Sequence, residues 1–261
     1  MNVLITGVAS GIGKALGQLF VHNSHFVYGV DINEITIDNI TTFHSDITNV
    51  DDLNTVKEYL KSNEIKLDMI INVAGIHKMV SLVESDFNQI QKVIDINLCG
   101  TMLVNNTFHS LLSTNGKIVI ITSEVAEFDP MPFNGLYNVS KTALESYAQA
   151  LRQELNLIGQ KVITIQPGAI ETTLANNSLK DTEILANNTV LYKKQANKFL
   201  SLATKFMGKP IKTEKLAKFI YSKVTKRNPK YTYKIHRNFG LILLNILPKK
   251  LQCAIIKLLL N

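Results

Sequence analysis

The sequence has little of what marks several classes of protein. It contains 13 glycines, 6 prolines and no low-complexity tract in 261 residues, which excludes collagen-like and disordered chains. Its two cysteines, Cys99 and Cys253, are too few and too far apart for a small disulfide-stapled fold. The length and the 46% of hydrophobic residues are enough for one large core, alone or with an appendage.

Signals for secretion and for a metal ion are also lacking. Met1 runs directly into the apolar stretch Val3–Ile5 without a charged leader or a cleavage site, so we expect a cytoplasmic protein in a reducing compartment. The six histidines have no paired spacing with one another or with a cysteine. We therefore expect no bound metal.

Acidic residues are nearly absent from the end of the chain. From residue 193 onwards there are 17 Lys and Arg and one acid, Glu214, a balance of +16, whereas residues 1–192 carry 11 basic and 20 acidic residues, a balance of −9. This asymmetry predicts an anionic partner near one face. Nucleic acid fits poorly, because the basic residues alternate with Ile and Leu runs and no nucleic-acid-binding motif accompanies them.

No apolar run is long enough to cross a bilayer. The C-terminal runs on either side of Pro248-Lys249-Lys250 have about ten residues each, against roughly 20 for a spanning helix. Apolar helices with basic flanks can lie in an anionic membrane interface. They can equally pack on the same chain or on a partner subunit, and an acidic carrier protein is a further alternative.

Short apolar runs alternate with segments of helical period. The runs hold consecutive apolar residues, as strands covered on both faces do. Seven strands are predicted, at Asn2–Thr6, His25–Val30, Thr42–His44, Leu67–Val73, Lys117–Thr122, Lys161–Gln166 and Thr232–Ile235. The pattern predicts an α/β fold with a doubly wound parallel sheet and helices on both faces. Only Asn33–Thr41 is too short for a crossover helix, and we expect a turn or loop there.

A glycine-rich turn follows the first strand. Gly7, Gly11 and Gly13 have the spacing Gly-x-x-x-Gly-x-Gly, and a helical pattern begins at once. Such glycines permit tight bending and let backbone N–H groups approach a pyrophosphate, whose charge the helix N-terminus favours. The turn, with Ser10 and Ile12, is predicted to bind a dinucleotide rather than to serve as an ordinary turn.

Asp31 ends the second strand, 18 residues after Gly13. A carboxylate there can accept hydrogen bonds from the adenine ribose and would repel a 2′-phosphate, which favours NAD and leaves NADP as the alternative. Ser10 points the same way, since a basic residue there would help to bind a phosphate. Asp46 and Ile47 could flank the adenine, or Asp46 could mark the start of the next helix.

Two asparagine segments are further candidates. Asn72-Val73-Ala74-Gly75 closes the fourth strand with small residues, which would let a ligand lie against the sheet edge but would also suit an ordinary turn. Asn97 lies in a predicted helix among apolar neighbours. Because a buried amide is costly unless it is hydrogen-bonded, Asn97 has either a packing role or a functional one.

Tyr137 and Lys141 are the most specific candidates for catalytic residues. They lie four residues apart in a predicted helix and therefore project from one face. A nearby ammonium favours the phenolate and should lower the pKa of the tyrosine from its usual value of about 10. That would make Tyr137 a general acid–base. Ser123, at the end of the preceding strand, completes the set.

These elements, in this order over Asn2–Thr172, resemble the short-chain dehydrogenase/reductase (SDR) family, whose fold is a Rossmann-like sheet of about seven strands. By this resemblance, Tyr137 would exchange a proton with the substrate oxygen and Ser123 would orient that oxygen. Lys141 would hold the nicotinamide ribose, and Asn97 would position a water in a proton relay. The resemblance and the patterns together predict these cofactor-binding residues: Gly7, Ser10, Gly11, Ile12, Gly13, Asp31, Asp46, Ile47, Asn72, Ala74, Gly75, Tyr137, Lys141, Pro167, Gly168, Ile170 and Thr172.

One spacing departs from the family pattern. Ser123 precedes Tyr137 by 14 residues, one more than the commonest spacing, which would select Glu124. Ser123 is retained because an ionised Glu124 cannot donate a hydrogen bond. The loop around Asp129 and Pro130 can absorb the additional residue.

The remaining residues suggest the substrate side. We expect one SDR domain over residues 1–237, with a lid over about 173–210, and an apolar and basic extension over residues 238–261. The apolar residues of Leu174–Met207, with Met131 and Phe133, predict an apolar alcohol or ketone substrate, although they could simply pack on the domain. The sequence thus predicts an NAD-dependent oxidoreductase, commonly a homo-oligomer in this family. The alternative is a non-catalytic NAD(H)-binding regulatory or scaffold protein.

Overall fold

Parallel strands form the central sheet of the computed structural model, which describes residues 1–206 and 210–261, and all their side chains except those of 173–176 and 203–206. Among the described residues the main sheet has seven strands in the order β3-β2-β1-β4-β5-β6-β9. Its strands are β1 (Asn2–Thr6), β2 (Phe26–Asp31), β3 (Ile40–His44), β4 (Leu67–Asn72), β5 (Leu112–Ile121), β6 (Lys161–Pro167) and β9 (Thr232–Ile235). The predicted Rossmann-like α/β fold is confirmed.

The strand boundaries agree closely with the sequence pattern. The first and last strands have the predicted bounds, and β5 shows the largest difference because it begins at Leu112 instead of Lys117. Leu112 pairs with Leu67 across a register shift in an otherwise regular parallel pair. The strand order reverses between β1 and β4, and in open α/β sheets ligands bind outside the carboxyl ends of the strands at such a point.

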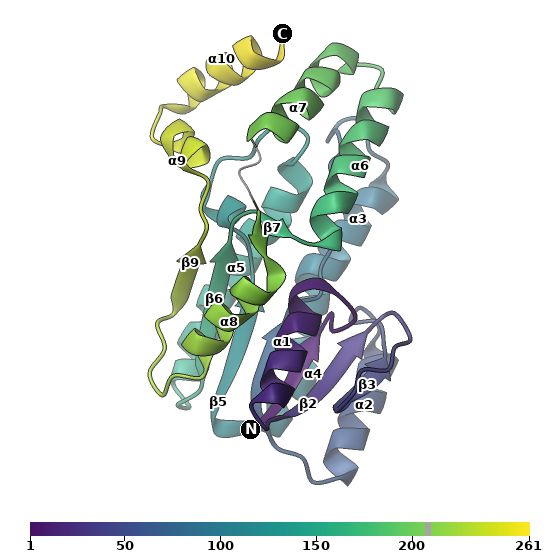
Figure 1. Cartoon of the computed structure of the whole chain (residues 1–261), viewed down its shortest axis with the longest axis vertical. Coiled ribbons are helices and arrows are strands. Elements are labelled where there is room, and N and C mark those ends of the chain that lie inside the picture. The colour runs from purple at the N-terminus through teal and green to yellow at the C-terminus, as the bar shows by residue number, and fades with distance from the viewer. Residues whose placement is uncertain (207–209) are drawn as a thin grey trace.

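Helices cover both faces of the sheet (Figure 1). The helices are α1 (Gly11–His22), α2 (Val50–Ser62), α3 (Phe87–Ile94), α4 (Thr101–Phe108), α5 (Gly135–Asn156), α6 (Thr173–Asn188), α7 (Lys193–Phe206), α8 (Thr213–Val224), α9 (Phe239–Asn245) and α10 (Lys249–Leu260). Short β7 (Ile170–Glu171) and β8 (Ile211–Lys212) pair outside the main sheet. No helix within the described ranges has the length and apolar character needed to cross a bilayer.

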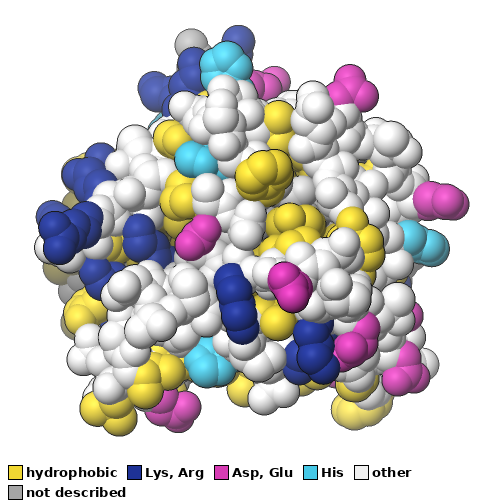
Figure 2. Space-filling view, turned by 90° about the horizontal axis from the view of Figure 1, so that it is seen from below, with side chains coloured by type: hydrophobic (Ala, Val, Ile, Leu, Met, Phe, Trp, Pro, Cys, Tyr) yellow, Lys and Arg dark blue, Asp and Glu magenta, His cyan; other side chains and the backbone are white. Residues whose placement is uncertain are grey.

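The two ends of the molecule differ. Helices α3, α6, α7, α9 and α10 gather beyond the carboxyl ends of the strands, and the C-terminus lies there (Figure 1). The opposite end carries acidic and basic side chains on the same face (Figure 2). A ligand at the carboxyl edge of the sheet is therefore covered by the second half of the chain.

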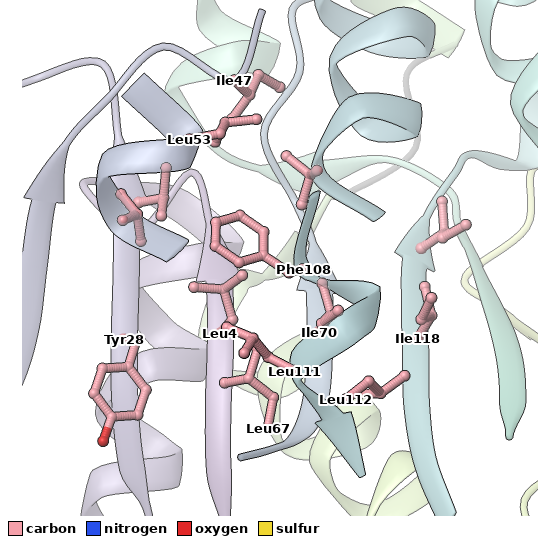
Figure 3. Close-up of a cluster of buried hydrophobic side chains, with 14 of the residues drawn as sticks. Leu4, Tyr28, Ile47, Leu53, Leu67, Ile70, Phe108, Leu111, Leu112 and Ile118 are labelled. Carbon is pink, nitrogen blue, oxygen red and sulfur yellow. The ribbon is translucent and has the colours of Figure 1, made fainter. Parts of the chain in front are cut away.

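The hydrophobic core has a layer on each face of the sheet. One layer joins Leu4 and Ile118 to α2 and α4 through Leu53 and Phe108, all of them inaccessible to solvent, as Figure 3 shows. The other joins the neighbouring strand residues to α1 and α8. Successive strand residues point to opposite faces, so both must be apolar, and this explains the consecutive apolar runs in the sequence.

The connection between β2 and β3 contains no helix, as its length predicted. Residues 32–39 form bends and turns with one bridge between Ile37 and Ile40. The next connection contains α2, and Asn49 caps it by accepting hydrogen bonds from the N–H groups of Asp51 and Asp52. The adenine end of the crevice therefore lacks a covering helix between β2 and β3.

Candidate active site

The glycine turn is folded tightly on itself. Gly7 and Gly11 have φ of +72° and +53°, which favour glycine. A Cβ on Gly13 would lie 2.1 Å from the Gly7 carbonyl oxygen, and a Cβ on Gly7 would lie 2.9 Å from the Cα of Ala74. The turn thus packs directly on the end of β4.

The N-terminus of α1 opens from this turn. Ser10 is its N-cap, yet the Ser10 side chain makes no capping hydrogen bond. The first N–H groups of a helix have no intrahelical partner and attract anions. Ile12 packs against the core below, and the Thr172 methyl group lies 3.7 Å from a Cβ built on Gly11. The residues present therefore fit a pyrophosphate.

Asp31 lies beside the turn. Its Oδ2 accepts a hydrogen bond from Ala9 N at 2.9 Å, and its Oδ1 accepts one from Asn33 N at 2.9 Å. The carboxylate is 8% exposed. It thus fixes the turn through the protein's own N–H groups and is placed at the end of β2, where the sequence predicted a contact with the ribose.

Asp46 and Ile47 have mainly local contacts. Asp46 Oδ1 accepts hydrogen bonds from the Thr48 N–H and hydroxyl, both at 2.8 Å, so the residue shapes the turn before α2. Ile47 is buried, and its side chain would meet a Cβ on Gly100 at 2.8 Å. Their contact with adenine stays a prediction.

Asn72 and Gly75 have different surroundings at the end of β4. The Asn72 Nδ2 donates to Asn105 Oδ1 at 2.8 Å, so this buried amide ties β4 to α4. A Cβ on Gly75 would lie 3.1 Å from Asn97 Oδ1 and 3.6 Å from Lys141 Nζ. Gly75 therefore belongs to the same cluster as Asn97 and Lys141.

Asn97 clamps this cluster from a π-helix over Asp95–Gly100. Its Oδ1 accepts a hydrogen bond from Ile76 N at 2.8 Å, and its Nδ2 donates to Ile76 O at 2.9 Å and to Ser140 Oγ at 3.0 Å. The side chain is inaccessible to solvent. The amide is thus fully hydrogen-bonded within the fold, as a packing role requires, and the positioning of a water in a proton relay by Asn97 stays a prediction.

Tyr137 and Lys141 project from the first turns of α5. The Lys141 Nζ lies 5.7 Å from the centre of the Tyr137 ring and donates to the Ile121 carbonyl at 3.2 Å. The last residues of β5 thus hold the amine beside the phenol. The two groups that the sequence paired lie side by side at the carboxyl edge of the sheet.

The pKa of Tyr137 differs from the lowered value that the sequence predicted. Burial raises the pKa of Tyr137 to about 12, partly offset by a hydrogen bond with Ser123. Burial also lowers the pKa of Lys141 to about 8, partly offset by the carboxylate of Glu145. The expected lowering of the pKa of the phenol by Lys141 is not seen, because burial disfavours both charged forms.

Ser123 and Glu124 point to different parts of the fold. Ser123 contacts Tyr137 through the hydrogen bond described above. The Glu124 carboxylate accepts a hydrogen bond from Asn238 N at 2.7 Å, and burial raises its pKa. Glu124 thus anchors the chain that follows β9, and Ser123 occupies the position beside the phenol despite the longer spacing.

His77 is a contact that the sequence analysis missed. Its ring centre lies 4.1 Å from that of Tyr137, and burial lowers its pKa. Its Nε2 donates to Asn134 Oδ1 at 2.7 Å, and its Nδ1 accepts a hydrogen bond from the Ser178 hydroxyl. The neutral imidazole therefore connects Tyr137 with α6. The position of His77, two residues after Gly75, is the feature of the sequence that could have pointed to this contact.

Residues 167–172 cross the carboxyl edge of the sheet. Pro167 ends β6, and Gly168 N donates to Ile235 O at 2.9 Å. A Cβ on Gly168 would lie 1.8 Å from the His236 carbonyl oxygen, so no other residue fits. Ile170 then pairs with Ile211, which directs the chain towards Thr172 and the glycine turn.

An apolar cluster lies above these residues. Phe133 makes edge contacts with Tyr192 and Phe199, with ring centres 5.7 Å and 5.5 Å apart, and Met79 and Leu185 pack with them. Ile184, Val190 and Leu191 of the predicted lid are exposed instead. The Leu174 and Phe206 side chains, and Met207 altogether, lie outside the described residues.

In the part of the chain that the structure describes, no group of three His, Cys, Asp or Glu side chains is placed to bind a metal ion. The chemistry open to the described site is proton transfer at Tyr137 beside a crevice that fits a dinucleotide. Both cysteines are free and exposed.

Comparisons with known proteins agree with this geometry. NADPH-dependent 1-acyldihydroxyacetone phosphate reductase of Schizosaccharomyces pombe is 34% identical over 185 residues, 68% of this chain and 62% of the yeast protein. 3-Ketodihydrosphingosine reductase of Bacteroides thetaiotaomicron is 26% identical over 236 residues, 89% of this chain and 87% of that protein. The matches to the fission yeast protein and to short-chain dehydrogenase anuB of Penicillium roqueforti span 62% and 59% of those relatives, less than two thirds.

Solved structures show the same fold. A short chain dehydrogenase family protein from Francisella tularensis superposes with a TM-score of 0.74 at 24% identity, over 90% of this chain and 96% of that one. The family profile described as short chain dehydrogenase matches residues 1–183. The chain belongs to the short chain dehydrogenase family of oxidoreductases.

Proposed function

We propose that the protein is an NAD-dependent reductase that converts an apolar ketone to a secondary alcohol, the reverse oxidation using the same groups. The observation that supports the proposal is that Ser123, partly buried Tyr137 and Lys141 lie together at the carboxyl edge of the sheet, beside the glycine turn. A protein that only binds NAD(H) has no use for a proton-transfer set.

Two groups would act on the substrate oxygen. A bound nicotinamide dinucleotide supplies or accepts the hydride. The Ser123 hydroxyl donates a hydrogen bond to the carbonyl oxygen, and the Tyr137 hydroxyl transfers its proton to that oxygen as negative charge develops there. The carbonyl thereby becomes an alcohol, and the phenolate left on Tyr137 is reprotonated from solvent.

The high pKa of Tyr137 favours reduction of a ketone over oxidation of an alcohol at neutral pH. With a pKa of about 12, the phenol is protonated at neutral pH and ready to donate. In the oxidative direction it must first lose that proton, so we expect oxidation to accelerate as the pH rises. The charge of Lys141 favours that loss while its amine is protonated.

Asp31 supports the choice of NAD over NADP. A carboxylate at the end of β2 can bind the ribose hydroxyls and repels a 2′-phosphate. The S. pombe relative is described as NADPH-dependent, so NADP is the alternative. Kinetic constants for NADH and NADPH with one ketone would decide between them.

The substrate class is proposed from the apolar cluster around Phe133, Tyr192 and Phe199. Two relatives are named for ketones in lipid molecules, an acyldihydroxyacetone phosphate and a ketodihydrosphingosine. We extend this to the present chain as a ketone attached to a long acyl or alkyl chain. Two or more copies of the chain would form the active protein, as is common in the family.

A screen of NADH and NADPH oxidation tests the proposal. Ketones that share one head group and differ in alkyl chain length should show kcat/KM rising with chain length. Binding of NADH without turnover of any ketone or oxidation of any alcohol would favour a regulatory or scaffold protein. Turnover that is indifferent to chain length would reject the apolar substrate.

A further inference from the structure

Helix α9 presents an apolar face to solvent. None of its residues is buried, and Phe239, Leu243 and Ile246 are 73%, 55% and 73% exposed. The spacing of these residues, four and then three, places them on one side of the helix. A short helix that docks on a protein normally turns its polar side outward, so α9 shows the reverse arrangement.

Helix α10 repeats this arrangement. Gln252 and Leu260 are buried towards the protein, whereas Leu251 and Leu258 are 46% and 80% exposed. At 100° per residue, the exposed pair lies on the side of the helix opposite to the buried pair. Lys257 is exposed beside the outward leucines.

Lysines surround these apolar faces. Helix α7 contacts the end of α10, where Gln195 Nε2 donates to Asn261 Oδ1 at 2.8 Å, and both helices lie at the same end of the molecule (Figure 1). Neither helix contains an acidic residue. Six of their lysines are exposed: Lys193, Lys194, Lys198, Lys249, Lys250 and Lys257. The Lys249 Nζ lies 3.4 Å from an Asp129 carboxylate oxygen, and its side chain remains 83% exposed.

We propose that the outward faces of α9 and α10, together with the lysines of α7 and α10, dock the protein on the surface of an anionic lipid bilayer. Apolar side chains rimmed by lysines are what such an interface favours. A second copy meeting this surface through its own equivalent surface would bring lysines against lysines, which repel. At the opposite end of the molecule, acidic side chains lie on the same face as basic ones (Figure 2).

A groove lies along the inward side of α10, next to the proposed docking surface. The groove has a volume of about 410 Å³ and lies between α10, at Cys253 and Ile256, and the loop with Met131 and Phe133. Gly135 also lines it and stands two residues before Tyr137. An alkyl chain that left the membrane beside α10 could enter this groove and reach the loop before Tyr137. This path rests on the proposed substrate class, whereas bilayer docking does not.

A single tryptophan tests the docking directly, because the chain has none. Leu258→Trp places the reporter on the proposed face, and Leu157→Trp places a matched control after the end of α5; the replaced leucines are 80% and 84% exposed. With full-length protein, phosphatidylcholine–phosphatidylglycerol vesicles should shift the Leu258→Trp emission to the blue, and brominated lipid should quench it. The control should show neither effect.

Three results would overturn the proposal. Emission unchanged for both variants would mean that no docking occurs, and equal shifts for both would mean adsorption without a preferred face. A blue shift of Leu258→Trp that depends on protein concentration without vesicles would mean that a second copy covers the surface. None of these results depends on enzymatic activity.

Charge reversal provides a second test that leaves the core untouched. The triple variant Lys194→Glu, Lys250→Glu and Lys257→Glu should reduce the affinity for anionic vesicles, measured by flotation, at least about a hundredfold, since each lysine near an anionic surface strengthens binding about fivefold and each glutamate adds repulsion. The control variant Lys66→Glu, Lys226→Glu and Lys230→Glu changes the net charge by the same amount, at other exposed positions. It should retain binding within a few fold. Equal loss in both variants, or loss in neither, contradicts the proposal.

Discussion

Tyr137 and Lys141 are ionisable side chains that the fold removes from water. Burial raises the pKa of the phenol to about 12 and lowers that of the amine to about 8. Each shift disfavours the charged form, so at neutral pH burial destabilises the protonated amine of Lys141, whereas the neutral phenol of Tyr137 is unaffected. Two predictions at the scale of the residue follow from this arrangement.

Tyr137→Phe should abolish turnover and leave cofactor binding intact. The substitution removes the hydroxyl that we propose as the proton donor and keeps the ring that contacts His77. We expect kcat to fall by about 10³-fold or more, within the usual contribution of general acid catalysis, and NADH affinity to stay within a few fold. Steady-state rates and NADH fluorescence titration measure both. Turnover near that of the unsubstituted protein would assign the proton transfer to another group.

Lys141→Met should alter the pH dependence of stability. Below pH 8 the buried ammonium is charged in both states, and the folded state is disfavoured; between pH 8 and 10.5 the folded protein loses this proton first and gains stability. The shift from 10.5 to about 8 corresponds to about 3 kcal/mol. Between pH 7 and 10.5, the free energy of unfolding of the unsubstituted protein should therefore rise by about 3 kcal/mol relative to that of Lys141→Met. Urea unfolding across this range measures it, and a constant difference contradicts the prediction.

At the scale of the element, the glycine turn depends on close backbone approach. A Cβ on Gly13 would lie 2.1 Å from the Gly7 carbonyl oxygen, so Gly13→Ala must displace the turn. We expect NADH affinity to fall by at least tenfold. Gly159→Ala is the control, because a Cβ there would meet only the Thr114 carbonyl oxygen, at 3.7 Å, and Gly159, with φ of +81°, lies just before β6, at the end of the sheet opposite to the carboxyl edge. It should cost about 1 kcal/mol of stability and leave NADH affinity unchanged. Equal affinities in both variants would remove the turn from the cofactor site.

The elements were predictable because their causes are local. Consecutive apolar residues identify the strands, and a four-residue spacing puts Tyr137 and Lys141 on one helix face. The contact of His77 with Tyr137 and Ser178 was not predictable, since it joins segments about 60 and 100 residues away. The raised pKa of the phenol was missed for the same reason: burial is a property of the assembled fold. The π-helix at Asn97 carries no periodicity that distinguishes it from an α-helix.

At the scale of the whole molecule, the last helices hold the loop that precedes Tyr137. Asp129 lies between Ser123 and Tyr137 in the chain. Its N–H donates to Asn245 Oδ1 at 2.6 Å, and its Oδ2 accepts a hydrogen bond from Gln252 Nε2 at 3.1 Å. Residues more than 100 positions later therefore fix this loop from outside the sheet.

Asp129→Ala should weaken substrate binding without affecting the cofactor. The variant removes one of the two acceptors of buried Gln252 and the partner of Lys249, so α10 and the loop lose a shared contact. We expect kcat/KM for a long-chain ketone to fall about tenfold through KM, NADH affinity to remain unchanged, and stability to fall by about 1 kcal/mol. Glu58→Ala removes an exposed carboxylate 3.7 Å from Lys61 on α2 and should change none of these quantities. An unchanged KM in Asp129→Ala would mean that the C-terminal helices have no role in substrate binding. The loop would then keep its position without its contact with them.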